Sequence, residues 1–274
     1  SNYFNAGEKF DVDVIVSDNT THSVQGTFSI PTGFSNVMFD TRYIQSNIEV
    51  GDRLDALGIQ GETDIFDFAF SSKLINMRKQ VLQLRTGLQM RQHESFLQDT
   101  LTPQDNIRQM FVEGSYLARL PNILIFTSMR VAAGLDIWGA AEKGESDATR
   151  AEGDPEVVLL QPTIFANIRT SDKGTLQATM TGQVASNVTL SSDLFVIGGY
   201  GSVRGFEPAE TTGEAGWQAS IEYSHEIWSG NMSGKAVTAS AGPFFDGGHV
   251  WNRLDAQTSD NTLLSAGVGA EVQA

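Results

Sequence analysis

One arginine and one aspartate stand out in this chain of 274 residues, because glycine and aromatic residues surround both of them. Arg204 lies within IGGYGSVRGF (residues 197–206), and Asp246 lies further on, within FFDGG (residues 244–248). An arginine and a carboxylate that meet away from water form short, charge-assisted hydrogen bonds, and glycines allow the close backbone approach that such a pair needs. In the alternative interpretation, Arg204 is an ordinary external loop residue and Asp246 a turn residue beside two glycines.

Other kinds of chemistry find little support in the sequence. The glycines from Gly199 to Gly205 do not follow the G-x-G-x-x-G spacing of a nucleotide loop, and Glu207-Pro208 follows where a helix would have to begin. No G-x-S-x-G stretch is present. The histidines lack HExxH spacing and are interpreted as isolated surface or lumen residues: His22, His93, His225 and His249. We therefore expect no enzyme activity, no cofactor and no metal site.

The pattern along most of the chain has a period of two residues. Between Leu82 and Met90, for example, apolar residues alternate with polar ones such as Gln83, Arg85 and Gln89. Such alternation is typical of strands with one apolar and one polar face. Twelve candidate strands follow from it: residues 8–17, 22–31, 34–45, 62–75, 80–92, 106–119, 122–138, 157–170, 174–186, 216–228, 235–250 and 262–273. The sequence thus predicts an all-β protein.

The lengths of these strands and of the segments between them indicate a membrane-spanning barrel. Several candidate strands exceed ten residues, which suits tilted strands that cross a bilayer better than a soluble sandwich. The short connections are residues 31–33, 76–79, 120–121, 171–173 and 229–234. The long connections are residues 46–61, 92–105, 139–156 and 187–215. Short and long alternate, as in outer-membrane barrels with a meander topology, short periplasmic turns and long external loops.

Composition excludes several other classes of protein. A formal net charge of −15 argues against a nucleic-acid partner, because binding to phosphates needs a basic surface. The most apolar window, residues 122–141, contains Arg130 and Asp136 and so is no ordinary membrane-spanning helix. Since only helices and closed barrels satisfy their backbone in lipid, a barrel remains. The acidic segments 139–156 and 207–214 are interpreted as solvated loops.

A soluble all-β barrel or sandwich is the main alternative to a membrane barrel. The apolar face, however, is mixed with Gly, Ala and Thr, whereas the opposite face carries arginines: Arg42, Arg85, Arg91, Arg130 and Arg169. This distribution favours a wide polar lumen with lipid outside. Asp246 shares the parity of Thr238, Ser240 and Gly242, and it therefore faces the lumen in this interpretation.

Two of these motifs resemble those of a known family. Residues 203–206 (VRGF), preceded by residues 197–199 (IGG), resemble the sixth-loop signature of the outer-membrane transporters of two-partner secretion, the TpsB type. Residues 244–248 resemble the family's strand motif F-x-D-x-G. The residues that carry the resemblance are Gly198, Gly199, Val203, Arg204, Gly205 and Phe206 in the loop and Phe244, Asp246 and Gly248 in the strand.

The resemblance implies a function and a site. In the family the loop folds back into the pore and its arginine pairs with the strand aspartate, which assigns these roles to Arg204 and Asp246, while Gly205 and Phe206 shape the loop tip. The lumen charges Arg85, Arg130 and Arg169 would then line a polar path. The implied function is passage of a large unfolded exoprotein (an adhesin, haemolysin or contact-dependent toxin) across the Gram-negative outer membrane without a nucleotide. The implied partners are that exoprotein and membrane lipid, and we expect a monomer.

The chain also departs from the family pattern. Family barrels have sixteen strands, two POTRA domains and an N-terminal plug helix, whereas this sequence suggests about twelve strands and no POTRA pattern. We therefore expect residues 1–274 to form a transmembrane β-barrel domain that is incomplete at both ends. Two other functions stay open: a barrel-assembly factor of the BamA type, which would carry five POTRA domains upstream, and a passive diffusion porin, which would conduct steadily without a partner.

Overall fold

The architecture is a single long antiparallel meander. The structure, a computed structural model, describes residues 7–17, 21–49, 59–97, 100–145, 148–232, 234–253 and 261–273. Within these residues, twelve strands form one sheet: β1 (Lys9–Ser17), β2 (Thr21–Pro31), β3 (Val37–Glu49), β4 (Ile59–Asn76), β5 (Gln80–Leu97), β6 (Thr100–Arg119), β7 (Ile123–Gly134), β8 (Val158–Arg169), β9 (Gly174–Ala185), β12 (Ala215–Met232), β13 (Lys235–Trp251) and β14 (Asn261–Gln273).

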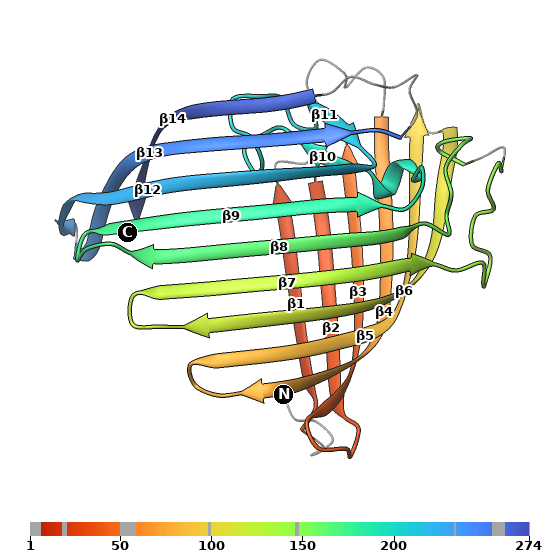
Figure 1. The fold of residues 1–274 in the computed structure, drawn as a ribbon, viewed down its shortest axis with the longest axis horizontal. Helices are drawn as coiled ribbons and strands as arrows, with labels where there is room; N and C mark the ends of the chain where they lie inside the picture. The colour runs from red at the N-terminus through yellow and green to blue at the C-terminus, as the bar shows by residue number, and fades with distance from the viewer. Residues whose placement is uncertain are drawn as a thin grey trace.

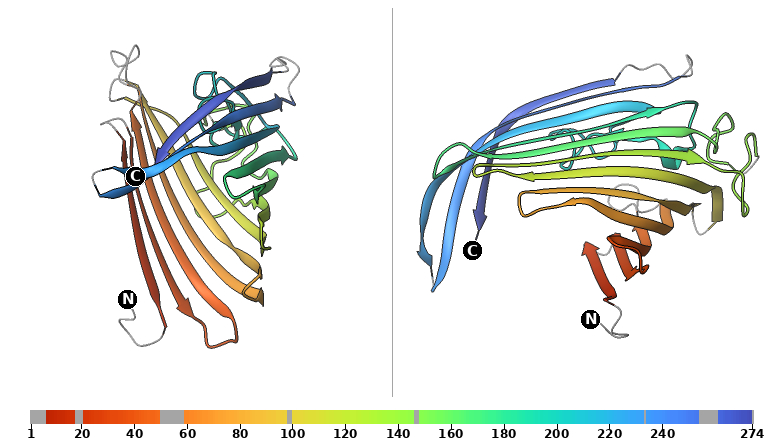
Figure 2. Two further views of the ribbon diagram at one scale, coloured as in Figure 1. Left: turned by 90° about the vertical axis from the view of Figure 1, so that its left-hand side faces the viewer. Right: turned by 60° about the horizontal axis from the view of Figure 1, so that its bottom comes forward.

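Each strand pairs with the next one along the chain, except that β9 pairs with β12. The residues between β9 and β12 contain a separate two-stranded ladder, β10 (Phe195–Ile197) with β11 (Thr211–Gly213), and a short 3₁₀ turn, η2 (Ser191–Asp193). The sheet curves strongly, so that its first and last strands run in very different directions (Figures 1 and 2). This is the antiparallel barrel-type meander that the alternation predicted, with the strands at the predicted places.

The two faces of the sheet differ as the period of two requires, because successive side chains of a strand point to opposite faces. On one face, here called the outer face, large apolar side chains remain exposed, including Phe66, Phe68 and Phe70 of β4. On the other, the inner face, polar residues of the same strands are buried, including Asp67 of β4 and Asp246 of β13. Exposed apolar residues outside and buried polar residues inside reverse the arrangement of a water-soluble barrel.

One connection differs from the prediction. The segment 92–105 was predicted to be a long loop, but β5 continues to Leu97 and β6 begins at Thr100, with the pairs Glu94↔Gln104 and Leu97↔Thr100. The segment 46–61 is also shorter as a connection, because β3 continues to Glu49 and β4 begins at Ile59. Backbone pairing can continue beyond the point where apolar residues stop alternating, and the sequence pattern does not report that continuation. The strict alternation of short and long connections was therefore wrong in detail.

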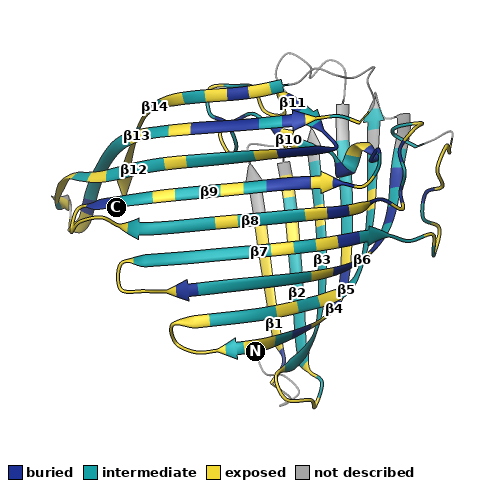
Figure 3. Ribbon diagram, in the orientation of Figure 1, coloured by how far each residue is buried: buried dark blue, intermediate teal, exposed yellow. Residues whose placement is uncertain are grey.

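The long connections that remain lie at one end of the sheet, opposite the tight turns. Residues 135–157 join β7 to β8, and residues 186–214 join β9 to β12. The second of these, here called the inward loop, lies inside the curve of the sheet with β10 and β11 (Figures 1 and 2). Buried residues concentrate on the strand ends beside this loop (Figure 3). No helix in the part of the chain that the structure describes has the length and apolarity of a membrane span.

The backbones of β12 and β13 approach each other closely at Gly242. A Cβ atom placed on Gly242 would lie 1.7 Å from the carbonyl oxygen of Tyr223, so that no side chain fits unless the two strands separate. Gly26 of β2 is a matched strand glycine, because a Cβ atom placed there meets nothing within 4 Å.

We expect Gly242→Ala to destabilise the folded sheet by about 1–3 kcal/mol, as forced overpacking commonly does. Gly26→Ala, the control, should have little effect. The measurement is the temperature at which the folded band disappears from unboiled detergent gels. Equal melting of the two variants would contradict the close approach.

Candidate functional site

The inward loop is held against the inner face of the sheet by its own short ladder. β10 pairs with β11 in the register Phe195↔Gly213 and Ile197↔Thr211, so that the intervening residues 198–210 form a closed tip. Ile197 and Val203 are fully buried and pack with Val250 of β13 and Leu263 of β14, and Phe206 packs against the same cluster. Burial of apolar side chains thus fixes the tip next to β13.

Glycines of the loop and of β13 make this packing possible. Gly198 and Gly199 adopt φ values of 114° and 90°, and Gly205 a φ of 90°, a region that residues with side chains rarely occupy. Gly248 of β13 lies under the loop, where a Cβ atom would come within 3.2 Å of the Cδ1 atom of Ile197. The backbone geometry therefore explains why glycine occupies these positions of the loop signature and of the strand motif.

The structure brings Arg204 and Asp246 together in a two-pronged ion pair. The Arg204 Nε atom donates to Asp246 Oδ2 at 2.7 Å, and its Nη2 atom donates to Asp246 Oδ1 at 2.8 Å. The backbone N–H of Arg204 also donates to Asp246 Oδ2, at 3.1 Å. The Asp246 side chain is completely buried and that of Arg204 is 19% exposed. Bidentate pairing of this kind adds geometric specificity to the charge interaction.

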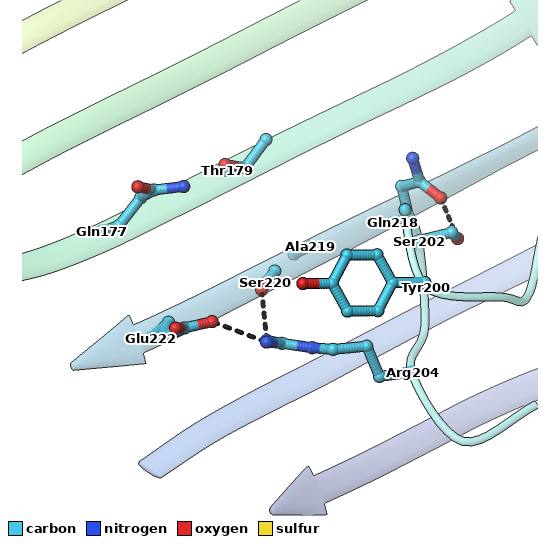
Figure 4. Close-up of a pocket in the computed structure, with 10 residues that line it drawn as sticks. Gln177, Thr179, Tyr200, Ser202, Arg204, Gln218, Ala219, Ser220 and Glu222 are labelled. Atoms are coloured by element: carbon cyan, nitrogen blue, oxygen red, sulfur yellow. Dashed lines mark hydrogen bonds and ion pairs between the residues drawn. The ribbon is translucent and has the colours of Figure 1, made fainter. Parts of the chain in front are cut away.

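Three further residues complete the surroundings of Arg204, and the motif alone did not identify their role. Glu222 of β12 accepts a hydrogen bond from Nη1 at 2.5 Å, and Ser220 of β12 accepts one from Nη2 at 3.3 Å (Figure 4). Phe244 lies beneath the guanidinium, with 3.5 Å between the Arg204 Cζ atom and the ring centroid. The register between β12 and β13 sets Ser220 and Glu222 beside this pair, and the sequence of a single strand does not reveal that register.

The electrostatics of this cluster favour the charged form of the arginine. Hydrogen bonds to Asp246, and secondarily to Glu222, raise the pKa of Arg204 further above its ordinary value. Arg204 therefore remains a cation throughout the physiological pH range. Among the described residues, no group of His, Asp and Glu is placed to hold a metal ion.

A second set of ion pairs fixes the base of the inward loop, and the sequence did not predict it. Glu214, at the end of the loop, is fully buried; its Oε1 atom accepts a hydrogen bond from Arg150 Nη2 at 2.6 Å. Arg150 also donates to the carbonyl oxygen of Thr189 at 2.8 Å, and the N–H of Arg253 donates to Glu214 Oε2 at 2.8 Å. Glu214 belongs to an acidic segment that was interpreted as solvated, and that interpretation was wrong for this residue.

Two more buried carboxylates join the same region. Asp193 in η2 forms an ion pair with Arg91 of β5, and Gln109 of β6 donates to it at 3.3 Å. Asp105 of β6 accepts hydrogen bonds from the hydroxyl of Thr149 at 2.7 Å and from the N–H of Ser192 at 3.1 Å. These contacts join the inward loop to residues 135–157, the other long connection. The described ion pairs of the loop thus attach it at two places, one at its base and one at Arg204.

The other predicted lumen charges lie apart from Arg204. Arg85 is 3.4 Å from Asp67, which is fully buried and also pairs with Arg42. Arg130 stacks over the ring of Phe111, with 4.0 Å between its Cζ atom and the ring centroid, and lies 3.9 Å from Glu113. These arginines occupy the inner wall formed by β3 to β7. Arg169 is exposed at the end of β8, among the tight turns, and takes part in neither cluster of described ion pairs.

The fold and the site together define a class: an outer-membrane β-barrel protein whose long loop turns inward and is attached to the wall through an arginine. Residues 3–272 match the model of the family described as haemolysin secretion/activation protein ShlB/FhaC/HecB. The chain belongs to this family. Its relatives place it in the outer membrane of a Gram-negative bacterium.

Individual relatives agree with that membership. The chain is 22% identical over 263 residues to the outer membrane transporter CdiB of Dickeya dadantii (strain 3937). This alignment covers 93% of this chain and 45% of the relative. Its fold is similar to that of CdiB from Escherichia coli, with a TM-score of 0.77 at 17% identity over 99% of this chain and 51% of that one. The fold is also similar to that of BamA from Haemophilus ducreyi, in a form lacking POTRA domains 1–3. The TM-score is 0.67 at 12% identity, over 98% of this chain and 59% of that one. The chain spans about half the length of these relatives.

We expect Glu214→Ala to loosen the base of the inward loop, because it leaves the largely buried Arg150 without its carboxylate partner. Removing one partner of a buried ion pair commonly costs about 3–5 kcal/mol. Hydrogen exchange of the peptides covering residues 187–195 and 211–215 should become faster, while exchange of the neighbouring strands stays slow. The control is Glu210→Ala, which removes an exposed acid of the same loop. Unchanged exchange in the Glu214 variant would contradict the attachment at the base.

Proposed function

We propose that this chain forms the pore through which a large unfolded exoprotein reaches the cell surface in two-partner secretion. The pore acts as a monomer in the lipid of the outer membrane, it is not an enzyme, and it uses no nucleotide. Family membership and the outer-membrane transporters among the relatives support this function. The observation that carries it is the inward loop, whose Arg204 is fixed to the inner wall by Asp246 and Glu222.

In this mechanism the Arg204–Asp246 pair is a latch that sets the resting state of the pore. A loop inside the curve of the sheet occupies space that a passing polypeptide needs, so its position must affect conduction. The tip residues Gly205 and Phe206 follow the latch arginine directly, and Phe206 packs on the apolar cluster beneath. When the latch opens, the tip leaves the wall and the cross-section available to the exoprotein changes.

The ion-paired inner wall supports passage of an unfolded chain. Arg85 and Arg130 lie on the wall beside carboxylates, so that a polar polypeptide meets balanced charges and not an isolated cation. Arg169, exposed among the tight turns, lies at the end where the exoprotein would enter. A wall of this kind offers many weak polar contacts and no single strong one, which suits a substrate that must move on.

A barrel-assembly role is the second candidate, because the fold is also similar to BamA from Haemophilus ducreyi. That likeness, at 12% identity, concerns the fold, whereas the family model favours secretion. The decisive experiment places the full-length protein and a candidate exoprotein from the same genome in a host that lacks both. Release of the exoprotein to the cell surface supports secretion. Retention of the exoprotein in the periplasm, together with impaired insertion of other barrels when the protein is deleted, contradicts it. Steady high conductance without any partner would instead identify a diffusion porin.

We expect Arg204→Ala and Asp246→Ala each to increase channel conductance in planar bilayers and to reduce secretion, with near-normal amounts of folded barrel. Each substitution removes one member of a buried pair, at a cost of about 3–5 kcal/mol to the loop's attachment. Because both act on the same contact, the double variant should resemble the singles and not their sum.

A matched control for the latch is Lys173→Ala, which breaks the solvent-exposed ion pair with Glu226, 3.5 Å long, on the same β12 strand. An exposed pair of this kind contributes about 0–1 kcal/mol, so secretion and currents should not change. Normal secretion and unaltered currents in both latch singles and in the double variant would show that the pair has a structural role alone.

A further inference from the structure

An exposed aromatic side chain stands beside the latch and has no part in it. Tyr200 is 91% exposed, although its neighbours along the loop, Gly199 and Val203, are buried. Its hydroxyl makes no hydrogen bond to another residue that the structure describes. Figure 4 shows the ring projecting from the loop over β12, beside Arg204. A large aromatic ring exposed on the inner side of the sheet needs an explanation, because it packs neither into the core nor on the outer face.

The backbone that carries this ring is fixed by hydrogen bonds. Tyr200 and Gly201 form the corner of a β-turn in which the N–H of Ser202 donates to the carbonyl oxygen of Gly199 at 3.1 Å. Ser202 accepts a hydrogen bond from the N–H of Gly198 at 3.2 Å and donates to Gln218 of β12. Two residues further on, Arg204 fixes the chain to Asp246. The turn therefore presents the Tyr200 ring from an anchored backbone.

The ring borders two polar recesses of the inner wall, and Arg204 and Glu222 line both recesses as well. One, of about 250 Å³, is lined by Tyr200, Gln177 and Thr179 of β9, and Gln218 of β12. The other, of about 460 Å³, is lined by Tyr200, Ser224 of β12, Ser240 of β13 and Glu271 of β14. An extended polypeptide lying along the wall from one recess to the other crosses the ring. The hydrogen-bonding side chains on either side suit backbone amides and carbonyls.

We propose that Tyr200 contacts the polypeptide in transit, as a rigid aromatic surface over which an extended segment slides. This inference rests on the secretion function proposed above and adds the residue that touches the cargo. A tyrosine provides a large amphipathic contact at low entropic cost, because it has two rotatable side-chain bonds. Contact through a ring face and one hydroxyl tolerates many sequences, as a pore for a long unfolded chain requires.

The test places a photoreactive phenylalanine analogue at position 200 of the full-length transporter, with an exoprotein stalled in transit by a folded domain fused to its end. A matched control carries the analogue at position 245, because Phe245 is adjacent to Asp246 in sequence but lies exposed on the outer face. We expect crosslinks to the stalled exoprotein from position 200 and none from position 245. Crosslinks from position 177 on the recess wall without any from position 200 would overturn the inference.

A second measurement uses the secretion rate. Tyr200→Ala should slow secretion about two- to tenfold, the factor that corresponds to about 0.5–1.5 kcal/mol for one aromatic contact. Conductance without cargo should stay at the parent value, because the Arg204 contacts remain. Phe245→Ala should secrete at the parent rate. An unchanged rate in Tyr200→Ala overturns the inference, whereas a parent protein that secretes nothing contradicts the proposed function itself.

Discussion

The inner organisation of this protein depends on one buried carboxylate that needs a cation. Asp246 is completely buried in β13, and an isolated ionised carboxylate in such surroundings is very unfavourable. The neighbouring strand β12 supplies Ser220, a neutral donor, and Glu222, which has the same charge as Asp246. The positive charge comes from the loop. Arg204 therefore fixes the tip where Asp246 requires it, and the glycines at 198, 199, 205 and 248 follow from the same constraint, because they let the loop backbone reach the wall.

The base of the loop repeats this principle with different partners. Glu214 and Asp193 are buried carboxylates of the loop itself, and their cations come from outside it, from Arg150 and Arg91. At the tip the loop provides the cation and the wall the acid; at the base the roles are exchanged. Since Arg150 belongs to the preceding long connection, the base attachment also joins the two long connections of the sheet. The ion pairs at the two ends of the β10–β11 ladder consequently have opposite polarity.

The alternation of residues predicted the strands, their faces and the parity of Asp246, because one period determines all three. It did not predict how far β5 and β6 extend, since pairing between backbones continues where the side-chain pattern fades. The Arg204–Asp246 contact could be anticipated from glycine-rich motifs and from a family resemblance. The role of Glu214 could not be anticipated, because a single acidic residue within an acidic segment looks the same in sequence whether it is solvated or ion-paired. Arg150, 64 positions away, becomes its partner through tertiary structure alone.

The two attachments differ in how readily they can open. At the base, Arg150 also donates to the carbonyl oxygen of Thr189, and Glu214 also accepts a hydrogen bond from the backbone N–H of Arg253, so opening that contact disturbs the backbone at two places. At the tip, the guanidinium binds side chains of the wall, and Glu222 is 38% exposed and able to exchange Arg204 for water. Loss of the tip contact exposes Asp246 and the apolar side chain of Val203, whereas loss of the base contact separates the inward loop from residues 135–157. Movement of the loop is therefore expected as a pivot of residues 198–210 on a stationary base, with Gly198 and Gly199 at the point where the tip leaves β10.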